Sequence, residues 1–225
     1  MIIDGKNVGT KNSYTFDNVS KSHSIKAEFK KAENVNPSTG IRFEDVKEND
    51  WFYEAVMDVV KNGWFKGTSN NLFSPYLSTE RGMIATVLWR MEGKPNSVKP
   101  SIFEDVPADA WFHDGVTWAN ENNEIVKGYG NGLFGPKDTI TREQLAAILY
   151  RYAAFKGYDV SKKTSLDGFK DGNQTVSYAI EAMQWAVANG LLIGTGNGIL
   201  DPKGHATRAE VAVILIRLDK FFGEK

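Results

Sequence analysis

Three arginines share one place in the chain, six residues after a proline: Arg81, Arg142 and Arg208. Two of them precede a capping-box partner, Gln144 or Glu210, which puts Arg142 and Arg208 at the first position of a helix. A cation is mildly unfavourable there, because the helix N-terminus already carries partial positive charge. We therefore predict a second role for these arginines, the binding of an anion by the guanidinium together with free backbone N–H groups.

An ion pair is the alternative role for each arginine. An acidic residue two positions after a recurrent phenylalanine offers a partner in each case: Asp45, Asp105 and Asp171. A structural ion pair would recur in three copies just as a ligand site would, so the sequence leaves both roles open.

Two tryptophans, Trp51 and Trp111, follow an acidic loop at a predicted helix start. A ring at such a place can be partly exposed and stack on the face of a sugar, and core packing is the alternative. Core packing is what we predict for the other four tryptophans: Trp64, Trp89, Trp118 and Trp185.

Catalysis finds little support in the sequence. The histidines His23, His113 and His205 do not recur at matching positions and lack the spacing of metal ligands. No Gly-x-Ser-x-Gly nucleophile motif is present, and the Gly-rich loop 128–132 is not followed by the Lys-Ser/Thr of a phosphate-binding loop. We interpret this loop as a tight turn between two helices. We expect neither an enzyme, nor a cofactor, nor a metal site.

These residues recur because the chain from residue 41 onward is built from three copies of one segment. The landmarks repeat at intervals of 60 or 61 and then 66 residues: Phe43, Phe103 and Phe169; Gly67, Gly128 and Gly194; Pro75, Pro136 and Pro202. Matched intervals in three copies indicate an internal repeat.

Each copy is predicted to form two helices joined by a Gly-rich loop. Apolar residues recur at helical spacing in the first helices, at 51–60, 111–119 and 178–187, and in the second helices, at 84–91, 145–152 and 211–218. One helix pair cannot bury its apolar stripe alone. We therefore predict a mainly α domain with pseudo-threefold symmetry, in which the repeats 43–92, 103–153 and 168–221 share one core.

The first 40 residues differ from the rest, since they contain neither Leu nor Trp. Alternation over 25–29 favours a short β-rich unit at 1–33, followed by a linker at 34–42. The stretches 4–9, 14–19 and 23–29 resemble the second half of the InlB-type B-repeat, a β-rich repeat of bacterial surface proteins. Only the tail of that module is present, and the first six residues lack the layout of a signal peptide. We interpret the chain as a fragment of a longer exported protein.

Composition excludes several functional classes. The 225 residues include no cysteine, which rules out disulfides, zinc–thiolate sites and thiol catalysis. The 27 basic and 28 acidic residues leave a net charge of −1, which argues against wholesale binding to nucleic acid or to an anionic membrane. No apolar run reaches the ~18 residues needed to span a bilayer.

The combination Phe-x-Asp-Val, Trp-Phe, Gly-x-x-x-Gly, Phe-x-Pro and Thr-Arg-(Glu/Ala) resembles the S-layer homology domain, in three copies over 43–221. The resemblance implies a helical prism with grooves between neighbouring repeats. It also implies noncovalent anchoring of a surface protein to the bacterial cell wall. The usual ligand of the family is a secondary cell wall polysaccharide attached to peptidoglycan, often bearing ketal-linked pyruvate, and its carboxylate suits the predicted anion site.

The candidate ligand-binding residues that follow are Arg81, Arg142, Arg208, Asp45, Asp105, Asp171, Trp51, Trp111, Thr141, Thr207, Glu143, Glu210, Gly128 and Gly194. The first copy departs from the pattern, because Glu80 replaces the threonine, and the third has Tyr178 in place of tryptophan. We therefore predict unequal grooves, with Arg142 and Arg208 carrying most of the affinity. The alternative is a structural module whose repeats bind protein partners, including copies of itself, in a surface layer.

Overall fold

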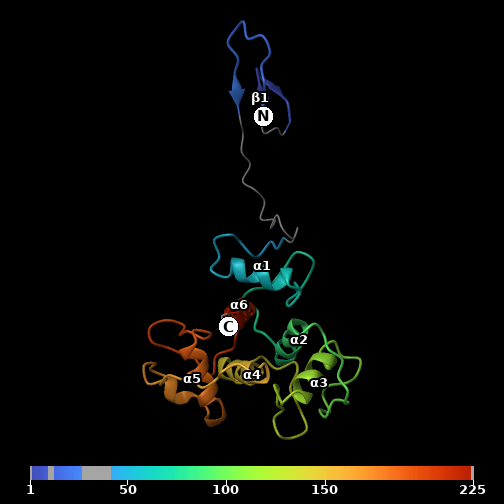
Figure 1. Cartoon of the computed structure of the whole chain (residues 1–225), viewed down its shortest axis with the longest axis vertical. Coiled ribbons are helices and arrows are strands. Elements are labelled where there is room, and N and C mark those ends of the chain that lie inside the picture. Colours follow the sequence, from blue (N-terminus) through green and yellow to red (C-terminus); the bar gives the residue numbers. More distant parts are fainter. Residues whose placement is uncertain (1, 10–12, 27–41, 224–225) are drawn as a thin grey trace. The chain divides into compact units, whose positions relative to one another are not determined.

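The computed structural model describes residues 2–9, 13–26 and 42–223. The chain divides into two compact units, Met1–Val35 and Asn36–Lys225, and each is described by itself (Figure 1).

The first unit is a small antiparallel sheet of three short strands: β1 (Ile2–Ile3), β2 (Lys6–Asn7) and β3 (Ile25–Lys26). The strand order is β2-β1-β3, so β1 pairs with both neighbours. Asp4 accepts a hydrogen bond from the backbone N–H of Ser24 at 2.8 Å, and its other oxygen lies 2.7 Å from Nδ1 of His23. The predicted β-rich segment is confirmed for these residues. Residues 27–29 and most of the predicted linker lie outside the described residues, and the B-repeat resemblance stays a prediction.

The second unit contains two α-helices in each copy of the repeat, as predicted. They are α1 (Tyr53–Lys61), α2 (Arg81–Met91), α3 (His113–Glu121), α4 (Arg142–Phe155), α5 (Ile180–Ala188) and α6 (Arg208–Gly223). Two short 3-10 helices, η1 (Gly172–Gln174) and η2 (Ser177–Ala179), precede α5. Within the described part of the chain, no helix combines the length and hydrophobicity needed to cross a bilayer.

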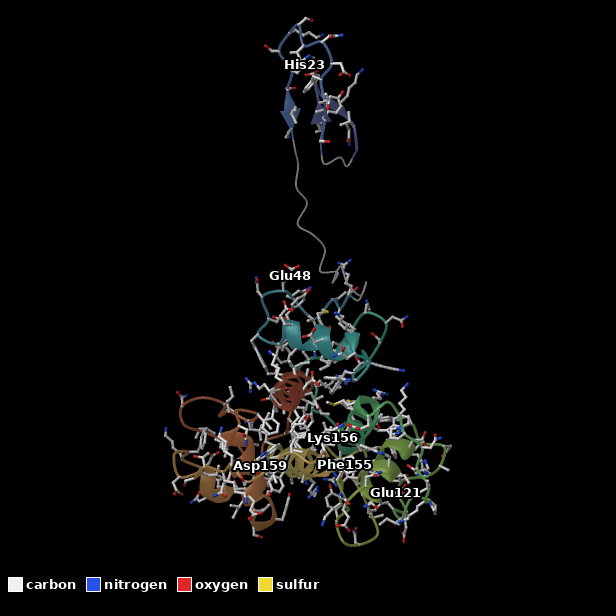
Figure 2. The ribbon with its side chains drawn as sticks, viewed as in Figure 1. His23, Glu48, Glu121, Phe155, Lys156 and Asp159 are labelled. Carbon is white, nitrogen blue, oxygen red and sulfur yellow. The ribbon has the colours of Figure 1, made fainter. Side chains whose placement is uncertain are left out.

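Helix pairing in this unit joins different copies. The second helix of each copy packs against the first helix of the next, α2 on α3 and α4 on α5, and α6 returns to pack on α1 (Figure 1). The apolar side chains of all three copies form one continuous buried cluster between the helices (Figure 2). The predicted shared core is therefore confirmed. It arises because the two helices of each copy pack against helices of the two other copies.

Short β-bridges just before the second helices also link the three copies to one another. Their members come from different copies in cyclic order: Glu80 with Thr139, Thr141 with His205, and Ser78 with Thr207. Because the last bridge joins the third copy to the first, the three copies form a closed pseudo-threefold domain.

Gly115 permits a close approach of α3 to α2. A Cβ at this position would lie 2.6 Å from the Cα atom of Thr86. We expect Gly115→Ala to lower the free energy of unfolding by about 1–3 kcal/mol, because overpacking outweighs the better helix propensity of alanine. Urea denaturation measures the change. Gly168→Ala is the control, since no atom lies within 4 Å of its added Cβ; equal losses in both variants would contradict the packing argument.

Candidate functional site

The backbone N–H groups at the starts of α2, α4 and α6 are bonded to neighbouring copies. The first N–H of each helix donates at 2.9 Å to a backbone carbonyl: Arg81 to Asp138, Arg142 to Gly204 and Arg208 to Leu77. The second N–H donates at 2.8–3.0 Å to a proline carbonyl, of Pro136, Pro202 and Pro75 respectively. The prediction that free N–H groups hold an anion here is therefore wrong, because the closed ring already uses these donors.

The three guanidinium groups also bond to backbone carbonyls of a neighbouring copy. In each, Nε donates to the residue that follows the Gly-rich loop, at 2.8–3.0 Å: Arg81 to Phe134, Arg142 to Leu200 and Arg208 to Phe73. In each, Nη2 donates at 2.6–2.9 Å to the residue before the loop glycine: Lys127, Ile193 and Lys66. All three side chains are buried. These arginines therefore stabilise the contact between copies. A ligand could bind only the guanidinium N–H groups that these carbonyls do not use.

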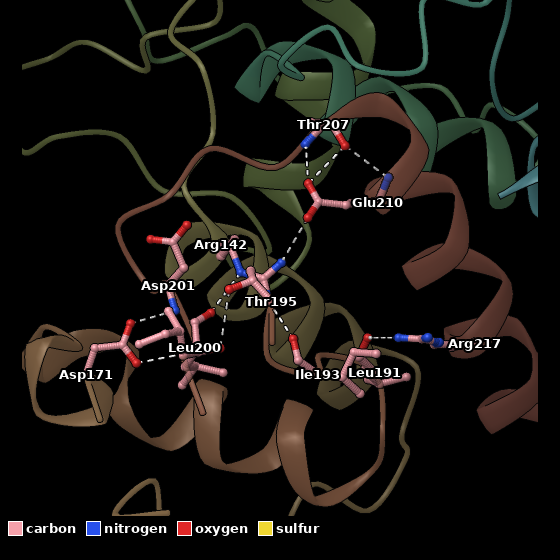
Figure 3. A network of polar contacts seen from close by, with 11 residues as sticks. Arg142, Asp171, Leu191, Ile193, Thr195, Leu200, Asp201, Thr207, Glu210 and Arg217 are labelled. Atoms are coloured by element: carbon pink, nitrogen blue, oxygen red, sulfur yellow. Dashed lines mark hydrogen bonds and ion pairs between the residues drawn. The ribbon is translucent and has the colours of Figure 1, made fainter. Parts of the chain in front are cut away.

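The aspartates of the repeated opening do not pair with these arginines. Each carboxylate accepts two backbone N–H groups at 2.7–2.9 Å: Asp45 from Phe73 and Ser74, Asp105 from Phe134 and Gly135, and Asp171 from Leu200 and Asp201. The alternative of an ion pair between each arginine and the aspartate of the opening is therefore wrong, whereas ligand binding through these aspartates stays a prediction. Within the described residues, one of the three arginines forms an ion pair: Nη1 of Arg142 lies 3.4 Å from a carboxylate oxygen of Glu210 (Figure 3).

The capping boxes are formed as predicted. Gln144 and Thr141 exchange hydrogen bonds at the start of α4, and Glu210 accepts from both the N–H and the hydroxyl of Thr207 (Figure 3). Thr141 and Thr207 thus cap helices. Glu143 is buried, and its oxygens accept from the N–H of Val176 and the ammonium of Lys203, so its predicted ligand role is corrected to a structural one.

The loop glycines are required by close packing. A Cβ on Gly128 would lie 2.4 Å from the carbonyl oxygen of Leu133, and one on Gly194 would lie 2.5 Å from that of Ile199. Neither has a positive φ, so lack of space is the physical reason at these two positions, whereas Gly130 and Gly132 of the same loop have a φ of 85°, as a tight turn requires. Both glycines line grooves, which leaves a contact with a ligand open to their backbone atoms.

Two grooves of equivalent construction lie between the copies. The Arg81 groove has a volume of about 510 Å³ and is lined by Arg81, Lys127, Gly128, Tyr129, Gln144, Ala147, Ile148, Arg151 and Tyr178. The Arg142 groove has about 280 Å³ and is lined by Arg142, Ile193, Gly194, Thr195, Glu210, Val213, Ile214, Arg217, Trp51, Leu191 and Leu192. Each groove is lined by residues of all three copies. One copy supplies the buried arginine, a second supplies an aromatic residue, and the third supplies the Gly-rich loop and the second helix.

The residue that faces the buried arginine differs between these grooves. Glu210 places a carboxylate beside Arg142, whereas the matching residue in the Arg81 groove is the neutral Gln144. Beside Arg208 the matching residue is Met83 of the first copy, whose sulfur lies 3.0 Å from Nη1. Of the two grooves, the Arg81 groove is therefore the one whose lining holds no carboxylate.

A second set of arginines follows Arg81, Arg142 and Arg208 by nine residues in the sequence, and two of its members enter a groove: Arg151 lines the Arg81 groove and Arg217 lines the Arg142 groove. Arg90, Arg151 and Arg217 each donate to a backbone carbonyl, of Trp64, Ile125 and Leu191. Burial lowers the pKa of Arg151, and the nearby charge of Arg81 lowers it further. Burial also lowers the pKa of Arg81, and that of Arg208 to about 10, yet all remain cations at neutral pH. Sequence reasoning missed this second set, although its fixed spacing was a usable signal.

The predicted exposure of two tryptophans is confirmed. Trp51 is 64% exposed and Trp111 55%, whereas Trp118 and Trp185 are buried and Trp64 and Trp89 pack against the core from its edge. Trp51 lines the Arg142 groove, and Tyr178 takes the equivalent place in the Arg81 groove.

The profile of the S-layer homology domain matches residues 42–76, 102–146 and 168–212, one match in each copy. The chain belongs to this family. S-layer homology domains are cell-wall-binding modules of surface proteins, so the repeats place the chain in that class.

Relatives of the S-layer homology region include structural proteins and an enzyme. The chain is 30% identical to an endoglucanase of Bacillus sp. (strain KSM-635), over 82% of this chain and 19% of the enzyme. It is 30% identical to the surface-layer 125 kDa protein of Lysinibacillus sphaericus, over 73% of this chain and 14% of that protein. It is also 30% identical to the S-layer protein sap of Bacillus anthracis, over 83% of this chain and 22% of that protein. The chain thus spans less than a quarter of each relative.

Proposed function

We propose that the S-layer homology unit is a non-catalytic anchor that binds an anionic sugar of a cell wall polysaccharide in the Arg81 groove. The anion is a carboxylate such as that of a ketal-linked pyruvate on a secondary cell wall polymer. The observation that carries the proposal is the meeting of Arg81 and Arg151 in one groove without a lining carboxylate.

The remaining donors of Arg81 suit such a ligand. Its Nε and Nη2 are used by backbone carbonyls, and among the described residues Nη1 has no bonding partner. The guanidinium lies 4.8 Å from the centre of the Tyr129 ring, which holds it in place. A carboxylate between Nη1 and the guanidinium of Arg151 would relieve the repulsion between the two cations and gain charge-assisted hydrogen bonds.

Aromatic rings at the same groove suit the sugar itself. Tyr178 is 59% exposed and Tyr129 49%, and each comes from a different copy. A pyranose ring can stack on either, while the phenol hydroxyl of Tyr178 adds a hydrogen-bonding group that tryptophan lacks.

This assignment ranks the grooves differently from the sequence-based hypothesis, which favoured Arg142 and Arg208. Glu80, which placed the first copy in doubt, is absent from the lining of the Arg81 groove and stands at the N-cap of α2. Glu210 partly neutralises Arg142, and Met83 takes up a donor of Arg208. These contacts support the Arg81 groove as the strongest anion site.

Cosedimentation with isolated bacterial cell-wall sacculi tests the proposal. We expect the protein to pellet with intact sacculi and to stay in solution after acid has stripped the secondary polymer. Binding that persists after stripping would point to peptidoglycan and contradict the polymer assignment. Absence of binding to either preparation would favour a surface-layer module that binds protein partners.

A further inference from the structure

Besides the two grooves, a hollow with a volume of about 640 Å³ lies beside Trp111. It shares no lining residue with the Arg81 groove. It is formed by the loop before α3 and by the turn that follows the second Gly-rich loop, residues 105–112 and 135–138. Trp111 is 55% exposed and contributes an open aromatic face. Pro107 and Pro136 add apolar surface next to it.

The first copy has a tyrosine where this hollow has a lysine. Tyr76 matches Lys137 in the repeat, and its ring packs edge-on to Phe52 with ring centres 5.7 Å apart. Phe52 is the counterpart of Phe112, which lines the hollow. A single substitution, Lys137→Tyr, should therefore fill the hollow of the second copy with a side chain that the fold already accepts in the first.

The polar groups of the hollow suit hydroxyl groups and disfavour anions. Asp109 is exposed and makes no hydrogen bond or ion pair with any described residue. Asp138 is also exposed, and Lys137 is the one cation among the residues that line the hollow. Carboxylates accept hydrogen bonds from sugar hydroxyls, and an aromatic face packs on the C–H face of a pyranose. An acidic sugar would be repelled by the excess of carboxylates.

Residues that line the hollow and residues that line the Arg81 groove are in direct contact. The hydroxyl of Tyr129, which lines the groove, donates to Oδ2 of Asp138 in the hollow at 2.8 Å. The backbone N–H of Arg81 donates to the carbonyl of the same aspartate at 2.9 Å. Two hydrogen bonds therefore join residues of the groove to Asp138 of the hollow.

We propose that the Trp111 hollow is a binding site for a neutral sugar of the same polysaccharide. The inference rests on the proposed anchoring function and extends it: the groove binds the acidic sugar and the hollow binds a neutral pyranose. Two weak sites on one glycan raise the overall affinity beyond that of either, because the second contact is intramolecular.

Nuclear magnetic resonance titration with the neutral trisaccharide of β-1,4-linked N-acetylglucosamine tests the hollow directly. The observed signal is the indole N–H of Trp111, assigned by its loss in Trp111→Phe. We expect a saturable shift in the wild type, at least tenfold weaker binding in Lys137→Tyr, and about fivefold weaker binding in Asp109→Ala, the value of one hydrogen bond. Glucuronic acid should leave the signal in place.

Two comparisons make the result decisive. Lys162→Tyr, at an exposed lysine outside the hollow, should bind the trisaccharide like the wild type. A Trp111 signal that does not move, or that moves equally in Lys137→Tyr, overturns the neutral-sugar site. Neither result depends on the Arg81 groove, because the trisaccharide carries no charge. Failure of the anionic groove would instead appear as acidic-polymer binding that Arg151→Gln leaves unchanged.

Discussion

Replacement of Arg208 by alanine is expected to lower the free energy of unfolding by about 3–5 kcal/mol in the absence of any ligand. The side chain is 2% exposed, and its guanidinium donates to the carbonyls of Phe73 and Lys66 at 2.8 and 2.7 Å. These carbonyls belong to the first copy and Arg208 to the last, so the contacts close the ring. Truncation leaves two buried acceptors unpaired, each at a cost of about 1–3 kcal/mol. Urea denaturation followed by circular dichroism measures the loss.

Two further variants separate this tie from a general effect of charge. Arg208→Lys keeps the positive charge, but its single ammonium group cannot bond to both carbonyls as the planar guanidinium does. We expect it to lower the free energy of unfolding by an intermediate amount. Arg217→Ala removes one partly buried hydrogen bond, at 3.3 Å to Leu191, and should cost about 0.5–1.5 kcal/mol. A loss below about 1 kcal/mol for Arg208→Ala would contradict a structural role and restore the simple ligand-binding interpretation.

Replacement of Arg151 by glutamine is expected to weaken binding to an acidic cell wall polymer by about 10–100-fold. Hydrogen bonds to charged groups contribute about 1.5–3 kcal/mol, and each 1.4 kcal/mol corresponds to a tenfold change in affinity. Arg151 lines the Arg81 groove, where it supplies the second cation. Isothermal titration calorimetry with the purified polymer, at fixed low salt, gives the change.

The repeat provides matched controls for Arg151→Gln. Arg90 and Arg217 occupy the same place in the other copies and make the same kind of bond, to Trp64 and Leu191. All three glutamine variants should therefore lose similar stability, while Arg151→Gln alone loses most of the affinity. Equal losses of affinity in the three variants would mean that the grooves are equivalent.

Local sequence patterns predicted the architecture well. The capping residues Thr141 and Thr207 and the helix starts at Arg142 and Arg208 follow from interactions within one turn, and such interactions are visible in the sequence. The shared core follows equally from apolar stripes too large for one helix pair. The exposure of Trp51 and Trp111 also followed from their place before a helix start.

Contacts between copies explain what could not be predicted. The carbonyl partners of Arg142 lie 51 and 58 residues away in the chain, and nothing local indicates that they satisfy the guanidinium. Contacts within one copy can be equally hidden, because the carboxylate of Asp105 accepts from backbone N–H groups 29 and 30 residues away. A polar residue that recurs three times is therefore ambiguous between a ligand site and a structural tie until the fold is known.

The contrast between Gln144 and Glu210 was present in the sequence but had no meaning there. Both residues were interpreted as capping partners, and both are. Their second role arises because each stands beside a buried arginine of the preceding copy, and the pairing of Arg142 with Glu210 depends on the packing of the second copy on the third.

Exchange of these two residues tests most directly whether the Arg81 groove binds the polymer because its lining holds no carboxylate. Gln144→Glu introduces a carboxylate beside Arg81, and Glu210→Gln removes the one beside Arg142; both variants keep a capping-box residue, so the helices remain capped. We predict at least tenfold weaker binding of the acidic polymer by Gln144→Glu and binding at least as strong as wild type by Glu210→Gln. Unchanged affinity in Gln144→Glu, with the protein folded, would contradict the account.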